Sequence, residues 1–363
     1  MLRPLMLVVF LFGLVLNIFS QPKSLTALKT TSDLQIDGNL DDAAWAQAPV
    51  ATGFVQNFPS FGNTASTRTE VRILYDNNAI YIGAHLYDDP SKIRKQFTAR
   101  DGEQRQDVDF FAVFLDTYND QQNGFMFLVT SKNVQSDSKL NQNSNASSGD
   151  FGDKSWDAVW ESNTRITENG WTVEMKIPYI SLRFAANPLQ TWGLQFTRFT
   201  RINNESVFWN PVDPNVNGFV NQFGKLTDLE NIQPPLRLSF SPYVSTGLRI
   251  NPKESRTATE WLRNGGMDVK YGLNESFTLD VTLIPDFGQV ISDNVINNLA
   301  PFEIQFQENR PFFTEGTELF NKAGLFYSRR IGGIPSGYYD TERFLDLNPG
   351  YTLQKNPSVT QLY

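Results

Sequence analysis

The stretch KSWDAVWESNTRITENGWTVEMKIPYISLRF, Lys154 to Phe184, decides the fold class. Two extended runs, Ala158 to Thr167 and Trp171 to Ile177, flank an Asn-Gly turn, which is the pattern of a β-hairpin. In the second run apolar residues alternate with Thr172, Glu174 and Lys176, so one face is expected to be buried and the other wet. A chain built around this hairpin needs further strands to pair with it.

Short extended segments with turn signals between them recur on both sides of the hairpin, and helical periodicity is almost absent. The clearest are Thr69 to Tyr75, Ile80 to Tyr87, Asp109 to Asp116, Gly124 to Thr130, Trp192 to Arg201 and a last edge strand, Phe223 to Leu226. Many short strands at regular spacing predict an all-β fold, an antiparallel two-sheet β-sandwich over residues 24–231.

The pattern changes after a predicted Pro-rich linker at residues 232–235. Beyond it, Leu236 to Leu248, Met267 to Leu273 and Phe277 to Ile284 alternate strictly between apolar and polar residues. About ten alternating residues per strand is typical of a membrane β-barrel, and a second soluble sheet is the alternative. Two or three strands cannot close a barrel, so we interpret residues 236–363 as its incomplete N-terminal part.

The first twenty residues predict a secretory signal peptide. Arg3 supplies the positive charge, Leu5 to Phe19 is apolar, and the small Ser20 precedes the expected cleavage point. The apolar run is too short for a spanning helix. Cysteine is absent from all 363 residues, which leaves no material for a disulfide framework or a lipid-modified cysteine. We therefore expect an exported protein of a bacterial envelope.

Composition excludes several classes of function. The net charge of −8 argues against nucleic acid as a partner, because phosphate binding needs a basic face. His85 is the one histidine, so a zinc site or a Ser-His triad has too few ligands or bases. No glycine-rich loop follows a strand and opens a helix, so we expect no nucleotide.

Carboxylates are numerous enough to keep a glycoside hydrolase open as an alternative. Five of them lie close together in sequence: Asp101, Glu103, Asp107, Asp109 and Asp116. Asp107 and Asp109 share a face at the start of a strand. Solvated loop acids are the simpler interpretation.

Oxygen-bearing side chains also gather between two of the predicted strands, at Asp116, Asn119, Asp120 and Asn123. A hard cation that needs six to eight oxygen ligands, such as calcium, suits this set. Tight turns use the same residue types, so a structural calcium and a plain turn both remain open. No other cofactor is expected.

Aromatic residues on loops are candidates for stacking on a sugar, with a charged or amide group beside them for its hydroxyls. Trp156 and Trp160 flank Asp157; Trp160 continues the strand pattern and is expected in the core, whereas Trp156 lies outside it. Trp209 is a second loop aromatic. Trp156, Trp209 and Asp157 are therefore the candidate carbohydrate-binding residues, and an anchoring role at strand ends is the alternative for both rings.

Taken together, four segments resemble a carbohydrate-binding module of family 9: LQIDGNLDDAAW (34–45), VRILYDNNAIYIGAHLYDD (71–89), DVDFFAVFLDTYND (107–120) and WDAVWESNTRITENGWTVEMKIPYISLRF (156–184). Three later segments are similar to a barrel domain of unknown function: MDVKYGLNESFTLDVTLIPDFGQV (267–290), FQENRPFFTEGTELF (306–320) and LFYSRRIGG (325–333). The whole resembles a family of Gram-negative outer-membrane proteins that join the two. The family's barrel continues far beyond Tyr363, so the chain resembles a fragment.

This resemblance implies a sugar-binding sandwich, in the periplasm or at the cell surface, tied to the outer membrane and serving glycan binding, uptake or catabolism. Family 9 modules bind sugars between paired tryptophans, and many carry structural calcium. The loops differ here, so the tryptophan pair does not map residue by residue. Two alternatives remain open, an O-glycosyl hydrolase and a structural or transport-assembly component whose module binds nothing.

Overall fold

The computed structural model describes residues 21–103, 106–141, 144, 151–154, 156–251, 258–273, 277–283 and 338–351. The predicted signal peptide at residues 1–20 lies outside this part of the chain. The described residues divide into two compact units, one ending at Gln233 and one beginning at Pro234, with the short segment Asp153–Ala158 grouped with the second unit. Each unit is described by itself.

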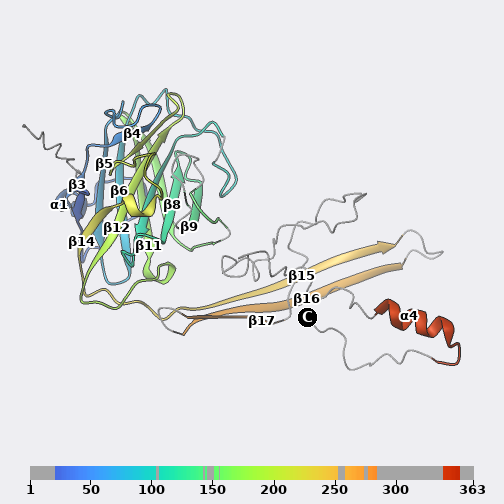
Figure 1. Ribbon diagram of the computed structural model, residues 1–363. Coiled ribbons are helices and arrows are strands. Elements are labelled where there is room, and N and C mark those ends of the chain that lie inside the picture. The colour runs from blue at the N-terminus through green and yellow to red at the C-terminus, as the bar shows by residue number, and fades with distance from the viewer. Residues whose placement is uncertain are drawn as a thin grey trace, which may run out of the picture. The chain divides into compact units, whose positions relative to one another are not determined.

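The first unit is a β-sandwich (Figure 1). Its larger sheet has the order β1-β14-β12-β7-β8-β9, with β13 beside β12 and β4 beside β13. These strands are β1 (Ser24–Thr26), β4 (Val55–Phe58), β7 (Phe110–Asp116), β8 (Gly124–Thr130), β9 (Gln135–Leu140), β12 (Leu189–Thr200), β13 (Glu205–Phe208) and β14 (Gly224–Glu230).

The smaller sheet has the order β10-β11-β6-β5-β2, with β3 added to β5. Its strands are β2 (Leu28–Lys29), β3 (Val50–Ala51), β5 (Thr69–Tyr75), β6 (Ala79–Tyr87), β10 (Glu161–Thr167) and β11 (Gly170–Pro178). Short helices, α1 (Ala43–Gln47), η2 (Tyr179–Ser181) and η3 (Val220–Gln222), connect strands at the rims.

The predicted hairpin is confirmed as β10 and β11, which pair from Glu161↔Lys176 to Thr167↔Gly170. Gly170 has a φ of +145° and lies against the backbone of Leu86, so a side chain has no room there. The alternating apolar residues of β11 are fully buried between the sheets. On β12, Trp192 and Phe196 are also fully buried.

The prediction of a purely antiparallel sandwich is wrong at the N-terminus. β1 pairs in parallel with β14, and β2 pairs in parallel with β5, so both sheets are mixed. Only Ala27 separates β1 from β2, so the chain crosses from one sheet to the other in a single step. β14 therefore lies between β1 and β12 and is not the predicted edge strand.

The outer face of β11 is not wet as predicted, because residues 34–48, here called the N-terminal strap, cover it. Glu174 on that face is fully buried, and its carboxylate accepts hydrogen bonds from the strap. Trp45 of α1 and Leu40 pack over Gly83 of β6, where a Cβ would meet Leu40 at 2.8 Å and Trp45 at 3.0 Å. The strap thus covers part of the outer face of the smaller sheet, over β11 and β6.

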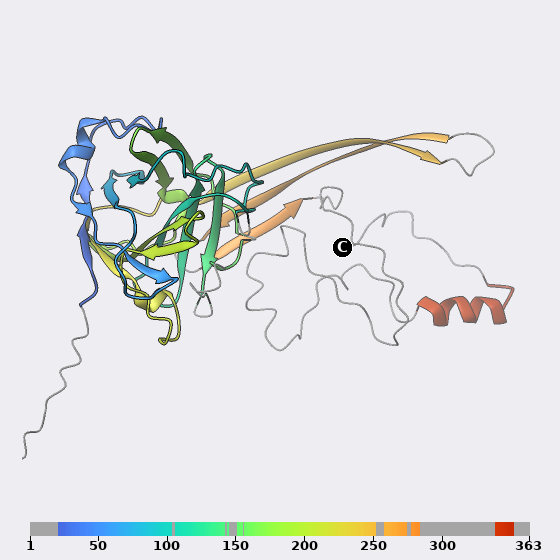
Figure 2. The same cartoon turned by 90° about the horizontal axis from the view of Figure 1, so that it is seen from above.

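The second unit contains a three-stranded antiparallel sheet of β15 (Leu238–Asn251), β16 (Ala258–Gly272) and β17 (Thr278–Leu283), the first two forming the long hairpin coloured yellow to orange in Figure 2. The register places Phe240, Val269 and Val281 side by side. Alternation places most of the large apolar side chains of this sheet on one face, and the register puts Thr246 and Arg263 on that face as well. Closure of these strands into a barrel stays a prediction.

Helix α4 (Tyr338–Leu347) also belongs to the second unit. Across the described residues, no helix combines the length and apolarity needed to cross a membrane.

Candidate functional site

An open groove of about 560 Å³ lies at one rim of the sandwich, beside the turn between β8 and β9. One wall is the loop that precedes β7, and the other is the β8–β9 turn with the start of β9. The residues lining it are Phe97, Thr98, Ala99, Arg100, Asn133, Val134 and Gln135. None of these seven residues was predicted from the sequence as a site residue.

Phe97 presents an apolar ring at this groove, with 76% of the residue exposed. The loop that carries it is closed at its base by the bridge between Lys95 and Val108 and by the N–H of Gln96, which donates to the carbonyl of Asp107. Packing does not explain an aromatic side chain held out on a closed loop. A flat exposed ring can instead stack on a ligand.

Arg100 supplies a planar guanidinium beside that ring. Its Nη1 donates to Gln135 Oε1 at 2.8 Å, and its Nη2 donates to Asp137 Oδ1. Both acceptors are on β9 two residues apart, so they share one face of the strand. The guanidinium is therefore held in one plane against β9.

Two side-chain amides complete the polar wall. Asn133, in the β8–β9 turn at a φ of +57°, donates from Nδ2 to the carbonyl of Ser162 at 3.0 Å. Gln135 donates from Nε2 to Ser162 Oγ at 2.9 Å and to the carbonyl of Trp160 at 3.2 Å. The start of β10 thus fixes both amides from behind.

Charged groups meet beside this wall. Arg100 pairs with Asp137 and lies 4.0 Å from Asp101, measured from Nε to Oδ2. The groove therefore presents fixed planar groups that can donate and accept hydrogen bonds.

The predicted sugar-binding tryptophans lie elsewhere. Trp209 is only 3% exposed, and its ring packs 5.7 Å from the ring of Phe196 in the core. Stacking of a sugar on Trp209 would require that ring to leave the core. Trp156 is half-buried and Asp157 is exposed, both in the segment Asp153–Ala158 that is grouped with the second unit. Their roles stay predictions.

The four predicted calcium ligands do come together in the β7–β8 loop, where they bond to the loop itself. Asp116 is buried, and its carboxylate accepts the N–H groups of Asp120 at 3.2 Å and Gln121 at 2.9 Å. Asp120 accepts the N–H and the Nδ2 of Asn123, at 2.9 and 3.0 Å. Burial raises the pKa of Asp116.

The ammonium of Lys225 donates to Asn119 Oδ1 in the same loop. A calcium ion would have to displace this cation and the loop's own N–H donors, so the residues in this arrangement do not fit one. Within the described ranges no group of three or more His, Asp or Glu side chains could hold a metal ion. Structural calcium stays a prediction that chelation can test.

The predicted acidic pair at the start of β7 is split. Asp107 is exposed, whereas Asp109 is buried and accepts the N–H of Arg201 at 2.8 Å. Burial raises the pKa of Asp109 to about 6. Glu103 and Asp116 are buried as well, so the interpretation of these acids as solvated loop groups is wrong for three of the five.

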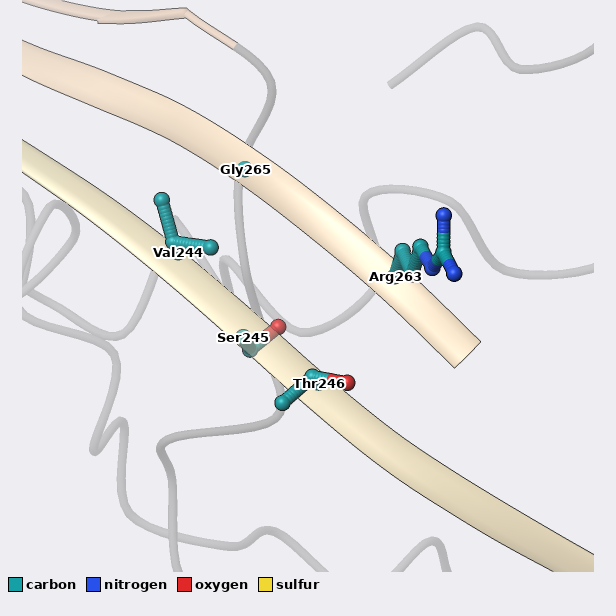
Figure 3. A pocket seen from close by; sticks show the side chains of 5 residues that line it. All are labelled: Val244, Ser245, Thr246, Arg263 and Gly265. Atoms are coloured by element: carbon teal, nitrogen blue, oxygen red, sulfur yellow. The ribbon is translucent and has the colours of Figure 1, made fainter. Parts of the chain in front are cut away.

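The second unit has its own hollow, of about 460 Å³, shown in Figure 3. It forms because Gly265 of β16 has no side chain opposite Val244 of β15. Ser245, Thr246 and Arg263 line the rest. Two neighbouring strands supply the whole lining, so the hollow is a feature of the sheet surface.

The chain was compared with known proteins. A family model described as Carbohydrate family 9 binding domain-like matches residues 36–227, more than half of the chain. The chain belongs to this family. The family 9 match contains the whole groove. A second model, Domain of unknown function (DUF5916), matches residues 234–363. The comparison with curated proteins found no match.

Solved structures similar to this family 9 domain include two of a carbohydrate binding module family 9 from Caldicellulosiruptor kristjanssonii. The complex with cellotriose has 18% identity and a TM-score of 0.41, covering 56% of this chain and 93% of that one. The complex with glucose has 17% identity and a TM-score of 0.40, covering 56% and 95%. A putative carbohydrate-binding protein from Bacteroides uniformis has 13% identity and a TM-score of 0.44, covering 57% and 99%.

The sequence did contain a signal for the groove. Phe97 is an isolated aromatic residue in a polar segment, KQFTARDGEQRQD, residues 95–107. Such a residue has no apolar neighbours to pair with in a strand pattern. A lone aromatic residue in a polar segment is a sequence signal for an exposed ring, and it applies to phenylalanine as well as to tryptophan.

Proposed function

We propose that this chain binds carbohydrate in the groove formed by Phe97, Arg100, Asn133 and Gln135. The observation that carries the proposal is the exposed ring of Phe97 beside three fixed planar polar side chains. A sugar has an apolar ring face and a rim of hydroxyl groups, and this pairing of one aromatic ring with planar donors and acceptors matches both. Membership of the family supports the same conclusion.

Neutral sugars are the first ligands to test. Glucose and cellotriose, which two of the similar solved structures contain, are suitable first probes. Trp156 and Asp157 are proposed as further ligand residues and are tested in the same way.

The test is calorimetric titration of the full chain with glucose and cellotriose, comparing Phe97→Ala with Phe61→Ala. Phe61 is also exposed, at 42%, but lies on the loop after β4 outside the groove. Loss of one stacking ring should weaken binding by about 1–2 kcal/mol, or roughly 5–30-fold. Phe61→Ala should bind like the wild type. Equal affinities for the two variants would contradict the assignment, and Trp156→Ala would then decide the alternative site.

We also propose that the second unit places the chain at a membrane. One face of its sheet carries exposed apolar side chains: Leu238, Phe240, Val244, Leu248, Trp261, Leu279 and Leu283. From Leu238 to Leu248 the band is about 34 Å long, at about 3.4 Å per residue, and it is interrupted near one end by the pair Thr246 and Arg263. At a tilt of about 45° it is about 24 Å tall, close to the apolar band of about 25 Å in outer-membrane barrels.

Two adjacent substitutions separate the faces of this sheet. Val244→Arg places a charge on the apolar face, and Ser245→Arg places it on the other. A charge at the middle of the lipid face costs about 2–4 kcal/mol, so Val244→Arg should reduce partitioning into phosphatidylcholine vesicles and Ser245→Arg should not. Flotation of the two variants with the vesicles measures the difference. Equal partitioning of the two variants into the vesicles would contradict the proposal that this face contacts a membrane.

Together the two proposals describe an exported envelope protein whose sandwich captures glycans at the outer membrane, for uptake or catabolism. Binding without turnover of the sugar is expected of it. Incubation of the chain with cellotriose, followed by product analysis, distinguishes a binding protein from a glycoside hydrolase.

A further inference from the structure

Asp137 lies behind the groove and does not line it. It is the third residue of β9, opposite Phe127 of β8, and its side chain is 1% exposed. A carboxylate held out of water is costly unless several donors face it. Hydrogen-bond donors must therefore compensate for the burial of the Asp137 carboxylate.

Two donors from different parts of the chain converge on one oxygen of this carboxylate. Arg100 Nη2, from the loop before β7, donates to Asp137 Oδ1, and Trp160 Nε1, from the segment before β10, donates to the same atom at 3.3 Å. The partners are 37 and 23 residues away in sequence. Asp137 thus joins both sides of the groove.

Each partner is fixed a second time. Arg100 Nη1 bonds to Gln135, and the ring of Trp160 packs edge-on against Phe127 with centroids 5.4 Å apart. With Asp137 in place, neither the guanidinium nor the indole can rotate without losing a charge-assisted hydrogen bond. The polar wall is consequently set before a ligand arrives, which lowers the cost of binding.

We propose that Asp137 is a positioning residue that orients Arg100 and Trp160 for sugar binding. This inference rests on the proposed function of the groove. Asp137→Asn keeps the size of the side chain and an Oδ1 acceptor, but it removes the negative charge that strengthens the hydrogen bond from the Arg100 guanidinium. The guanidinium should then be held less firmly, while the core of the sandwich is retained.

The affinity test is a double-mutant cycle in the full chain, with cellotriose as the probe. Asp137→Asn alone should weaken binding by about tenfold, the size of one lost hydrogen bond to a charged group. In an Arg100→Ala background its effect on affinity should be clearly smaller than in the wild type, because the part that acts through Arg100 is already lost. Asp107→Asn, an exposed acid outside the groove, is the matched control and should bind normally. Additive losses from Arg100 and Asp137 would overturn the proposal.

A second measurement needs no sugar. In the chain labelled with ¹⁵N-tryptophan and ¹⁵N-arginine, Asp137→Asn should shift the indole N–H resonance of Trp160 and the guanidinium resonances of Arg100, and Asp107→Asn should leave them unchanged. Unmoved resonances overturn the inference. If the wild type binds neither glucose nor cellotriose, the proposed function fails, and these resonances alone decide whether Asp137 positions its two partners.

Discussion

Removal of the Glu174 carboxylate should detach the N-terminal strap from the sandwich. The strap contributes three donors to it: the N–H of Asp37 at 3.0 Å and of Gly38 at 2.8 Å, and Trp45 Nε1 at 2.9 Å. The last two are buried. In Glu174→Ala these two donors have no acceptor, and water has little access to them.

The magnitude follows from that count. A buried donor left without a partner costs about 1–3 kcal/mol, so two cost about 2–6 kcal/mol. Removing the carboxylate also removes the cost of burying it, which offsets part of this loss. The net expectation is a free energy of unfolding lowered by about 2–4 kcal/mol, a large fraction of the stability of an ordinary domain.

The assay is denaturant unfolding at pH 8 followed by tryptophan fluorescence, because Trp45 reports directly on the strap. Glu161→Ala is the control: this glutamate lies on the neighbouring strand β10, is 61% exposed, and forms a 3.4 Å ion pair with Lys176. A surface pair contributes about 0–1 kcal/mol. If Glu174→Ala lost no more stability than Glu161→Ala, the reasoning that Glu174 anchors the strap would be refuted.

Three further predictions concern the same sandwich. Burial raises the pKa of Glu174 from 4.5 to about 7, so between these pH values the folded state keeps a proton that the unfolded state has lost. The free energy of unfolding of the wild type should therefore rise by up to about 3 kcal/mol as the pH falls from 7 to 4.5. Parallel profiles of this free energy against pH for the wild type and Glu174→Gln would contradict the prediction. Gly83→Ala should lower the free energy of unfolding by about 1–3 kcal/mol in the same assay, because the added methyl group would meet Leu40 and Trp45. An unchanged denaturant midpoint would show that the strap can shift to make room. The loop around Asp120 is held by its own N–H donors, so the melting temperature should not change in excess chelator. A lower melting temperature would support a calcium site at Asp116, Asn119, Asp120 and Asn123.

The strands were predictable because their signals are local. Residues 69–75 and 124–130 were predicted as strands with the bounds that the structure gives to β5 and β8. Strands as short as β1, β2 and β3 were missed, since two or three residues carry no readable alternation. Their pairing depends on partners far along the chain, and β1 joins β14 about two hundred residues later.

The candidate site was harder to predict than the fold. Trp209 was selected for its residue type and its position on a loop, yet tertiary packing buries it against Phe196. Phe97 remained exposed because its loop projects from the sandwich rim. Residue type gives the chemistry that a side chain could perform, but exposure is a property of the neighbours that fold against it.

By itself the sequence determined an all-β chain with a central hairpin and a change of pattern near Pro234, because alternation, turn chemistry and proline act over a few residues. The tertiary structure alone decided that the strap covers Glu174, and that Asp137 and Trp160 meet Arg100 behind one groove. These contacts join residues 23 to 136 positions apart, and no local pattern specifies them. They exist because packing two sheets and a strap around one core brings distant polar groups together, where each buried charge needs its donors.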